Sequence, residues 1–385
     1  MSLNVGVIGA GAMGTAISQC IAPNTNKLLL YARRKEICDD INEGHINCEY
    51  HPSVKLHENI RAVNDLCDLK DVDVIFLCIP SSVMRQTMVQ LNEIVSDKCI
   101  FVSTAKGIEN KTNKRMSEVI KEETGRSAVV LSGPNIASEM MKNLPSATTI
   151  ASIKKKDLEI VKSVLSTPKL KVNTNHDVIG TEFCGIIKNI LAISQGICKG
   201  MGINDNAKFA VFTKSYNETK CIIEKVGGNR STVDDYCGFG DIITASTLNV
   251  SRNHTLGIWY GQGVYLDEQT GVLFEGKNTA IVLKEICDKL NIECLTVNFV
   301  YDVINNAKVY SSNKDYSNYV FFKTKYMCSD KDGNTIFGDF LTGEVRTILE
   351  SKKKSVRVDK FMSSSDNYSV VVLLDDNKNT FYIFY

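Results

Sequence analysis

The sequence predicts an α/β fold: an N-terminal doubly wound sheet, then a mostly α-helical domain and a small β-rich C-terminal extension. Three observations predict this order. Short apolar runs alternate with helix-like segments over residues 1–150, strand signals become rare between residues 177 and 307, and the residues after about 310 are rich in Tyr, Phe, Ser, Asn and Asp. Strands that alternate with crossover helices are typical of a sheet covered by helices on both faces.

The first region contains candidate strands that are rich in Val, Ile, Leu and Phe and show little polar alternation. Such runs are typical of strands buried on both faces of a parallel sheet. The segments between them are long enough for crossover helices. The candidate strands are Asn4–Ile8, Lys27–Ala32, Asp73–Ile79, Cys99–Ser103, Ala128–Leu131 and Ala147–Ala151.

The same patterns divide the chain into three parts. We expect the sheet domain over residues 1–176, the helical domain over 177–310 and the β-rich extension over 311–385. In the extension, Ser369–Leu374 and Thr380–Tyr385 flank the polar segment Asp375–Asn379, which predicts a hairpin. A regulatory, oligomerising or partner-binding role and that of an inert cap are equally compatible with its composition.

Charge and cysteine content narrow the class of protein. The 45 Lys and Arg residues against 44 Asp and Glu give a net charge of +1, which disfavours a protein that coats nucleic acid. No apolar run reaches the ~18 residues of a membrane span, and no basic region precedes the first apolar residues, as it would in a secretory signal. The 13 cysteines form no CxxC pair, so we expect reduced thiols in a cytoplasmic protein.

A G-x-G-x-x-G pattern follows the first strand directly, with its glycines at Gly9, Gly11 and Gly14, and opens the helical stretch Thr15–Ile21. In a dinucleotide-binding, Rossmann-type turn the first glycine permits the tight turn. The second lets the backbone approach a pyrophosphate, and the third lets the helix pack on the strand. The helix N-terminus offers N–H groups and a positive dipole end to the phosphates. We therefore expect residues 1–176 to bind a nicotinamide dinucleotide.

The second strand ends in Tyr31-Ala32-Arg33-Arg34. In a site restricted to NAD, an acidic residue near this point binds the ribose 2′-hydroxyl. A guanidinium suits a 2′-phosphate instead. We expect NADPH or NADH as cofactor, with NADPH slightly favoured and Arg33 as the contact, whereas Arg34 is equally well explained as a solvated charge at a helix start.

Two lysines occupy positions that favour chemistry. Lys106 lies in Ser103–Gly107 at the end of a predicted strand, where ligands bind in open α/β sheets, and Leu131–Glu139 forms another turn of this kind. Lys188 lies in an otherwise apolar helix. A lone lysine there usually extends its ammonium to water. In a closed cleft, loss of hydration would instead make proton transfer feasible.

Polar residues further along the chain can complete such a site. The carboxylate of Asp241 can hold a lysine, Arg252 offers a planar fork for a phosphate, and Asn253 adds an amide donor. Each is singly more often a surface or cap residue. Their joint occurrence favours a binding site.

These segments, in order and at matching spacing, resemble the NAD(P)-dependent glycerol-3-phosphate dehydrogenases from about residue 3 to about residue 305. The resemblance implies hydride transfer between nicotinamide C4 and C2 of dihydroxyacetone phosphate, giving sn-glycerol 3-phosphate, without a metal. The matching segments are GAGAMGTA, YARR, FLCIPS, STAKGIE, LSGPNIASE, DVIGTEFCGIIKNILAISQGI, GINDNAKFAV, GFGDIIT, SRN and FEGKNTA.

The resemblance also implies residue roles. Lys188 matches the lysine that gives or takes the substrate proton, Lys106 matches the lysine that contacts substrate and cofactor, and Asp241 is the third catalytic residue. The implied substrate-binding residues are Lys106, Gly133, Asn135, Asn189, Asp241, Thr244, Ser251, Arg252 and Asn253. The implied cofactor-binding residues are Gly9, Gly11, Ala12, Met13, Gly14, Arg33, Lys106, Ala137, Arg252 and Glu275.

Two alternatives remain open. A related dehydrogenase could act on another small phosphorylated alcohol or hydroxy acid. An arginine that binds phosphate, however, would have no role in binding a substrate whose tail is uncharged. A non-catalytic NADPH-sensing module is disfavoured by the intact lysines.

The resemblance implies supply of a glycerophospholipid precursor, and homodimers are common among such enzymes, which makes a second copy a candidate partner. The chain departs from the family pattern at Thr213–Ser215, at Asp234–Cys237 and after about Ala307.

Overall fold

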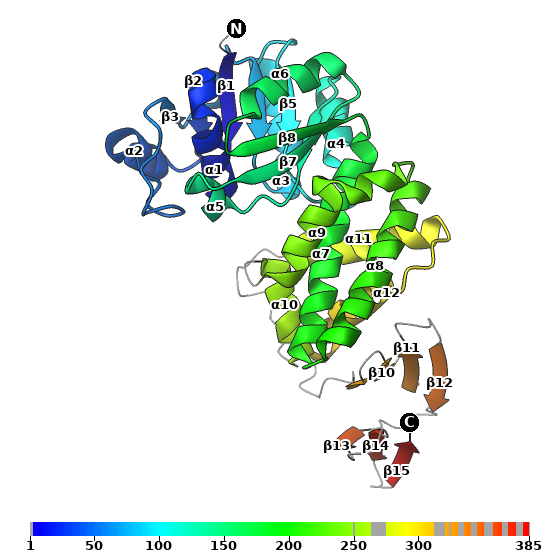
Figure 1. Cartoon of the computed structure of the whole chain (residues 1–385). Helices are drawn as coiled ribbons and strands as arrows, with labels where there is room; N and C mark the ends of the chain where they lie inside the picture. The colour runs from blue at the N-terminus through cyan, green and yellow to red at the C-terminus, as the bar shows by residue number, and fades with distance from the viewer. Residues whose placement is uncertain are drawn as a thin grey trace.

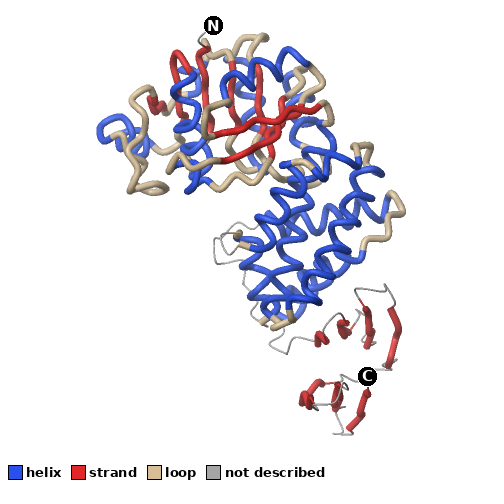
Figure 2. The backbone as a smooth tube through the Cα atoms, viewed as in Figure 1, coloured by secondary structure: helices blue, strands red, loops and turns tan. Residues whose placement is uncertain are grey.

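The computed structural model describes residues 3–248, 251–262 and 275–311, together with the strands between residues 320 and 384. Figures 1 and 2 show an α/β unit followed by a group of helices, which the long helix α7 (Val178–Gly200) joins to the sheet unit. This architecture confirms the predicted Rossmann-type doubly wound sheet followed by helices.

The N-terminal unit is built on an eight-stranded sheet in the order β3-β2-β1-β4-β5-β6-β7-β8. All neighbouring strands are parallel except β6 and β7, which are antiparallel. The purely parallel sheet that apolar runs suggest is therefore wrong at one pairing. The strands are β1 (Leu3–Ile8), β2 (Thr25–Tyr31), β3 (Ile60–Val63), β4 (Val74–Leu77), β5 (Ile100–Ser103), β6 (Val129–Ser132), β7 (Ser146–Ala151) and β8 (Leu170–Asn175).

The six predicted strands are all present, with ends displaced by at most two residues. Strands β3 and β8 were not predicted. Both lie at the edges of the sheet, and β8 alternates buried and exposed residues. A strand with one covered face lacks the continuous apolar run of a central strand, so long apolar runs do not indicate β3 and β8.

Helices cover both faces of this sheet, as Figure 2 shows. Residues of α1, α2 and α6 pack with Val5, Val7 and Leu30 on one face, and residues of α3 and α4 pack with Ile8 and Ile75 on the other. The helices are α1 (Ala12–Ile21), α2 (Lys35–Gly44), α3 (Ser81–Ile94), α4 (Met116–Thr124), α5 (Ala137–Met141) and α6 (Lys155–Leu165), with short 3₁₀ turns at Ala22–Asn24 and Leu66–Leu69.

The predicted helical region is confirmed. Helix α7 is buried over most of its length, and the Asp177 carboxylate caps its N-terminus by accepting a hydrogen bond from the Gly180 N–H at 2.8 Å. Around it lie α8 (Asp205–Lys225), α9 (Asp241–Thr247), α10 (Arg252–Gly261), α11 (Glu275–Lys289) and α12 (Leu295–Ser311), with a 3₁₀ turn at Arg230–Asp234 and a π-helical turn at Tyr236–Gly240.

Helices α7 and α10 cross at backbone contact. A Cβ added to Gly196 would lie 2.1 Å from the His254 carbonyl oxygen, and one added to Gly257 would lie 2.2 Å from the Ile193 carbonyl oxygen. No side chain fits such a gap, so glycine is required at both positions. The close crossing brings the start of α10 beside the middle of α7, where Lys188 lies.

The extension contains two antiparallel sheets. The first has the order β12-β11-β10-β9 and the second the order β13-β14-β15. Strands β14 and β15 pair as the sequence predicts for a hairpin, while its turn, Asp375–Asn379, lies outside the described residues. The strands are β9 (Val320–Phe322), β10 (Lys325–Ser329), β11 (Thr335–Asp339), β12 (Val345–Leu349), β13 (Arg357–Ser363), β14 (Ser369–Leu374) and β15 (Thr380–Phe384).

Candidate active site

The glycine-rich turn between β1 and α1 has the geometry that its pattern predicts. Gly9 has φ +106°, and its N–H donates to the Tyr31 carbonyl at 3.1 Å. A Cβ on Gly14 would lie 1.9 Å from the Gly9 carbonyl oxygen, whereas a Cβ on Gly11 would meet nothing within 4 Å. Gly9 and Gly14 therefore serve the turn and its packing, and Gly11 faces open space.

The open side of Gly11 fits a dinucleotide. Gly11, Ala12 and Met13 line a cavity between the sheet unit and the helices, and no side chain caps the N-terminus of α1 at Gly11. Backbone donors and the positive end of the helix dipole thus face a space that a pyrophosphate can enter. Helix α1 begins at Ala12, three residues before the predicted start at Thr15.

A loop that sequence reasoning missed supports this turn. Asn47 Nδ2 donates to the Ala10 carbonyl at 3.0 Å, and His51 Nε2 lies 2.9 Å from the Ala12 carbonyl oxygen. Both side chains are buried, and the neighbouring Tyr50 lines the cavity. The available signal was a polar loop with several hydrogen-bonding side chains, which singly indicates only a turn.

The two arginines after β2 differ. Arg34 forms an ion pair with Glu49. Arg33 is exposed, and within the described part of the chain its guanidinium has no partner, although its carbonyl accepts a hydrogen bond from Asn64 Nδ2 at 2.8 Å. Arg33 is thus available to a ligand at the end of β2, but it does not line the cavity beside Gly11.

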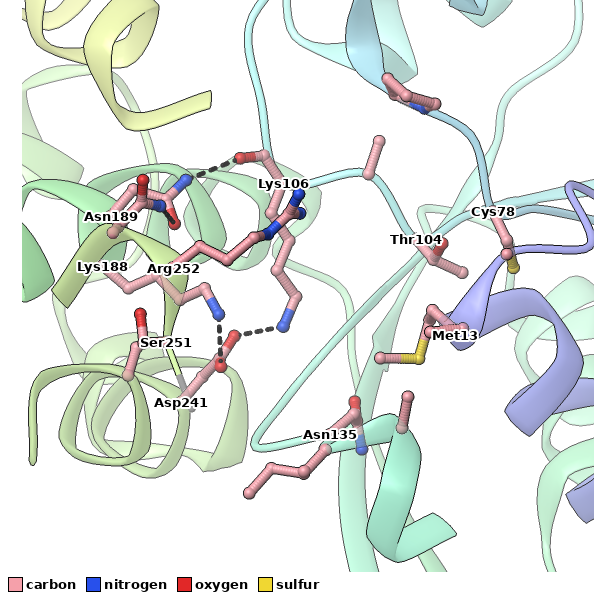
Figure 3. Close-up of a pocket in the computed structure, with 18 of the residues that line it drawn as sticks. Met13, Cys78, Thr104, Lys106, Asn135, Lys188, Asn189, Asp241, Ser251 and Arg252 are labelled. Atoms are coloured by element: carbon pink, nitrogen blue, oxygen red, sulfur yellow. Dashed lines mark hydrogen bonds and ion pairs between the residues drawn. The ribbon is translucent and has the colours of Figure 1, made fainter. Parts of the chain in front are cut away.

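A cavity of about 590 Å³ lies between the sheet unit and the helices. Its wall includes most of the predicted site, and Figure 3 shows Lys106 and Lys188 pointing toward Asp241 inside it. The predicted residues that line it are Gly11, Ala12, Met13, Lys106, Asn135, Ala137, Lys188, Asn189, Asp241, Thr244, Ser251, Arg252 and Asn253. Residues that sequence reasoning did not single out also line it: Tyr50, Cys78, Ile79, Pro80, Thr104, Ala105, Ile136 and Ala245.

One carboxylate joins the two lysines. Lys106 Nζ lies 2.5 Å from Asp241 Oδ2, and Lys188 Nζ lies 2.8 Å from Asp241 Oδ1. The side chain of Asp241 is 3% exposed, and those of Lys106 and Lys188 are 18% and 14% exposed. Two ammonium groups and one carboxylate leave a net positive charge in a poorly hydrated place, which favours an anionic ligand.

Burial has a direct consequence for Lys106. Desolvation lowers the pKa of Lys106 to about 8, helped by the charge of Lys188 and opposed by the Asp241 carboxylate. Its ammonium also donates to the Gly133 carbonyl at 3.0 Å. Gly133 thus meets the site through its backbone, although it does not line the cavity. A lysine of this kind can change charge near neutral pH.

A π-helical turn places Asp241. Tyr236–Gly240 forms this turn directly before α9, and a Cβ on Gly238 would lie 2.1 Å from the Val233 carbonyl oxygen. π-turns are uncommon and occur often at functional sites. The departure from the family pattern at Asp234–Cys237 therefore leads into the turn that aims the carboxylate at both lysines.

Two asparagines connect the lysines to α10. Asn189 Nδ2 donates to the Lys106 carbonyl at 3.1 Å, and Asn253 Nδ2 donates to Asn189 Oδ1 at 2.9 Å. Asn253 Oδ1 is buried without a hydrogen-bond partner among the described residues, and a Cβ added to Gly276 of α11 would lie 2.6 Å from it, so this atom faces α11. The two asparagines therefore link the segment of Lys106 to α7 and α10.

The start of α10 supplies a cation. Ser251 Oγ caps the helix by accepting from the His254 N–H at 3.3 Å. Arg252 is exposed at the cavity, and among the residues that the structure describes its guanidinium has no ion-pair or hydrogen-bond partner. Thr244 Oγ1 donates to the Gly240 carbonyl at 2.7 Å. Arg252 is therefore the cation best placed to take up a phosphate.

The remaining predicted residues fall in different places. Asn135 lines the cavity, but its amide already bonds Ala147 and Thr148. Ala137 begins α5 at the cavity wall. Glu275 is the first residue of α11, and its side chain lies outside the described part.

The sheet, the glycine turn and the charged cavity define an NAD(P)-dependent dehydrogenase of the Rossmann class with a separate helical unit. Models of the NAD-dependent glycerol-3-phosphate dehydrogenase N-terminus and C-terminus match residues 4–158 and 177–312. The chain belongs to the glycerol-3-phosphate dehydrogenase family and is an oxidoreductase that uses NAD(P).

Individual relatives support this family membership. Glycerol-3-phosphate dehydrogenase [NAD(P)+] of Methanothermobacter thermautotrophicus is 36% identical over 76% of this chain and 90% of its own length. The enzyme of the same name from Halothermothrix orenii is 34% identical over 80% and 92%. The crystal structure of glycerol-3-phosphate dehydrogenase from Coxiella burnetii is 28% identical, with a TM-score of 0.74 over 81% of this chain and 99% of its own.

More distant structures share the fold alone. A ketopantoate reductase from Ralstonia eutropha has a TM-score of 0.53 at 13% identity. Among the described residues, no helix combines the length and apolarity that crossing a membrane requires.

Proposed function

We propose that this protein reduces dihydroxyacetone phosphate to sn-glycerol 3-phosphate, reversibly, with NADPH or NADH. The observation that carries the proposal is the Lys106–Asp241–Lys188 cluster, which lies in one cavity with the glycine turn and Arg252. The names of the relatives supply the substrate, and the positive cavity suits a phosphorylated one. When bound, the reduced nicotinamide supplies the hydride.

In this proposal Lys188 is the general acid. Its Nζ gives a proton to the oxygen on C2 as negative charge develops there, and takes the proton back during oxidation. Asp241 holds both ammonium groups in place. The positive charge of Lys106 is already in place where the alkoxide develops, so it stabilises that negative charge without reorganisation of water. Such electrostatic stabilisation is the largest contribution to catalysis in many active sites.

The substrate-binding residues are assigned by chemistry. Arg252 binds the phosphate through its guanidinium. Asn253, which follows Arg252 on the cavity wall, is assigned to the substrate as well. Gly133, Asn135, Asn189, Thr244 and Ser251 complete the substrate side.

The cofactor side follows the turn. Gly9, Gly11 and Gly14 shape the pyrophosphate site, Ala12 and Met13 line it, and Arg33 contacts the ribose 2′-phosphate, which slightly favours NADPH. Lys106, Ala137, Arg252 and Glu275 complete the proposed set.

We also propose the division into a dinucleotide-binding domain (1–176), a helical substrate-binding and catalytic domain (177–310) and an extension (311–385). Strand β8 ends at Asn175 and α7 begins at Val178, which supports the first boundary. In this proposal the enzyme supplies a glycerophospholipid precursor in the cytoplasm, and its candidate protein partner is a second copy of the chain.

The test is oxidation of NADPH and of NADH by the full chain with dihydroxyacetone phosphate as substrate. Consumption of both reactants with formation of glycerol 3-phosphate supports the proposal. NADPH binding without turnover of this substrate would contradict it and would favour another substrate or a sensor.

A further inference from the structure

The segment that carries Lys106 is a small hairpin between β5 and α4, which we call the Lys106 strap (Lys106–Ser117). Ile108 and Arg115 pair across it as an antiparallel bridge, and the Glu109 N–H donates to the Lys114 carbonyl at 2.9 Å. The two ends of the strap are therefore neighbours. A displacement of Arg115 is transmitted through one pairing to Ile108, two residues from Lys106.

Residues on one face of α7 bind both ends of this strap. Glu182 and Asn189 are seven residues apart, which is two helical turns, so they lie on the same face. Asn189 holds the Lys106 carbonyl, as Figure 3 shows. Between them, a Cβ on Gly185 would lie 3.3 Å from Lys106 Cγ. Glu182 holds the other end.

The contacts of Glu182 account for its whole carboxylate. Oε1 accepts from the Ser117 N–H at 2.8 Å, and Oε2 accepts from Ser117 Oγ at 2.5 Å and from the Arg115 guanidinium at 2.7 Å. The side chain is 3% exposed. Glu182 does not line the cavity. Its partners all belong to the strap end and the first turn of α4.

We propose that Glu182 is a positioning residue for Lys106: it anchors the far end of the Lys106 strap to the helix that carries Lys188, and so holds the two ammonium groups in register on Asp241. The proposal rests on the proposed function, in which Lys106 contacts the substrate. Asn189 fixes the Lys106 end of the strap, and Arg85 of α3 binds its middle by donating to both carboxylate oxygens of Glu109 at 2.8 and 2.7 Å. Glu182 ties the far end to α7, the helix that carries Lys188. Small displacements of a catalytic group are costly.

A purely structural role would look different, and the chain provides a comparison. Glu218 in α8 is also a buried carboxylate, and it also holds the start of another helix, accepting from the Leu295 and Thr296 N–H groups at 3.3 and 3.0 Å. It touches neither the strap nor the cavity. Loss of Glu218 should lower stability without changing the chemistry.

The experiment compares Glu182→Ala and Glu182→Gln with Glu218→Ala and Glu218→Gln in the full chain. We measure kcat, KM for dihydroxyacetone phosphate, thermal unfolding, and hydrogen exchange of the amides in residues 106–117. Glu182→Ala is expected to lower kcat about 100-fold with little change in KM, and to speed exchange in the strap. Glu182→Gln retains an acceptor for Ser117 but loses the charge facing Arg115, so its kcat should fall between that of Glu182→Ala and wild type. The Glu218 variants should unfold at a lower temperature but keep the wild-type kcat and KM.

The pH profile separates positioning from stability. Burial holds the pKa of Lys106 at about 8, so water admitted by a loose strap should move the alkaline limb of kcat/KM to higher pH in Glu182→Ala and leave it in place in Glu218→Ala. If Lys106→Ala is inactive while Glu182→Ala keeps the wild-type kcat and limb, the positioning role is wrong and the proposed function stands. If Lys106→Ala keeps the wild-type kcat, the catalytic assignment of Lys106 is wrong, and the role of Glu182 falls with it. Should Glu182→Ala fail to fold, Glu182→Gln decides between the same outcomes.

Discussion

Lys106 and Lys188 bind different oxygens of one carboxylate, that of Asp241, at 2.5 and 2.8 Å. The first lysine comes from the end of a sheet strand and the second from the middle of α7. Because Asp241 binds one lysine from the sheet unit and one from the helical unit, the geometry of the site depends on how these two units are positioned. Because the carboxylate neutralises only one of the two ammonium groups, the cluster keeps a positive charge for the substrate.

Replacing Lys188 with alanine should lower kcat about 100-fold or more, because general acid catalysis contributes about 10²–10⁴-fold. KM for dihydroxyacetone phosphate should change little, since the proton is transferred only in the transition state. Steady-state kinetics with NADPH check this. A matched control is Lys199→Ala on the same helix, near its C-terminal end. An equal loss in both variants would contradict the assignment.

The rate should depend on the charge of Lys106. Its pKa of about 8 means that the side chain is charged below this pH and neutral above it, so kcat/KM for the reduction should fall as pH rises through about 8. Lys106→Arg keeps its charge at every accessible pH. A pH series on both proteins checks the origin of this limb. The same alkaline limb in Lys106→Arg would assign it to another group.

Much of this site could be predicted from the sequence, for a physical reason. Glycines in a phosphate turn and polar residues after apolar strands are local patterns, and parallel strands bring their ends together. Sequence could not show that Asp241 serves both lysines, that Asn47 and His51 hold the turn, or that Glu182 reaches Ser117. These contacts join elements distant in the chain, and each residue alone resembles an ordinary surface or cap residue.

Arg252→Ala should raise KM for dihydroxyacetone phosphate about 10- to 100-fold, the effect of losing a hydrogen bond to a charged group. The guanidinium has no partner among the described residues, so its removal leaves no buried group unpaired. Dihydroxyacetone, which lacks the phosphate, provides the control. Rates measured with both substrates should show a loss only for the phosphorylated one. Equal losses with both would mean that Arg252 acts elsewhere.

Cofactor choice should depend on Arg33 and not on Arg34. Arg33→Asp places a carboxylate where a 2′-phosphate would bind, so the ratio of kcat/KM for NADPH to that for NADH should fall about 10-fold or more. Arg34 already pairs with Glu49, which makes Arg34→Asp the matched control. Initial rates with each cofactor decide the matter. An unchanged ratio in Arg33→Asp would remove Arg33 from this role.

Removal of residues 312–385 should leave catalysis nearly intact. The relatives match 76–80% of this chain but 90–92% of their own length, and the family models end at residue 312, so the dehydrogenase part is accounted for without the extension. Among the described residues, all those that line the cavity precede residue 254. A chain ending at Ser311 keeps α12, whose Val297, Val300 and Ile304 pack in the core of the helical unit. Its kcat and KM should therefore match those of the full chain.

Measuring sedimentation together with kinetics separates two roles of the extension. A truncated chain that is folded but changes its oligomeric state would assign assembly to the extension, whereas a folded chain with a lower kcat would show that the extension reaches the active site and would contradict this prediction.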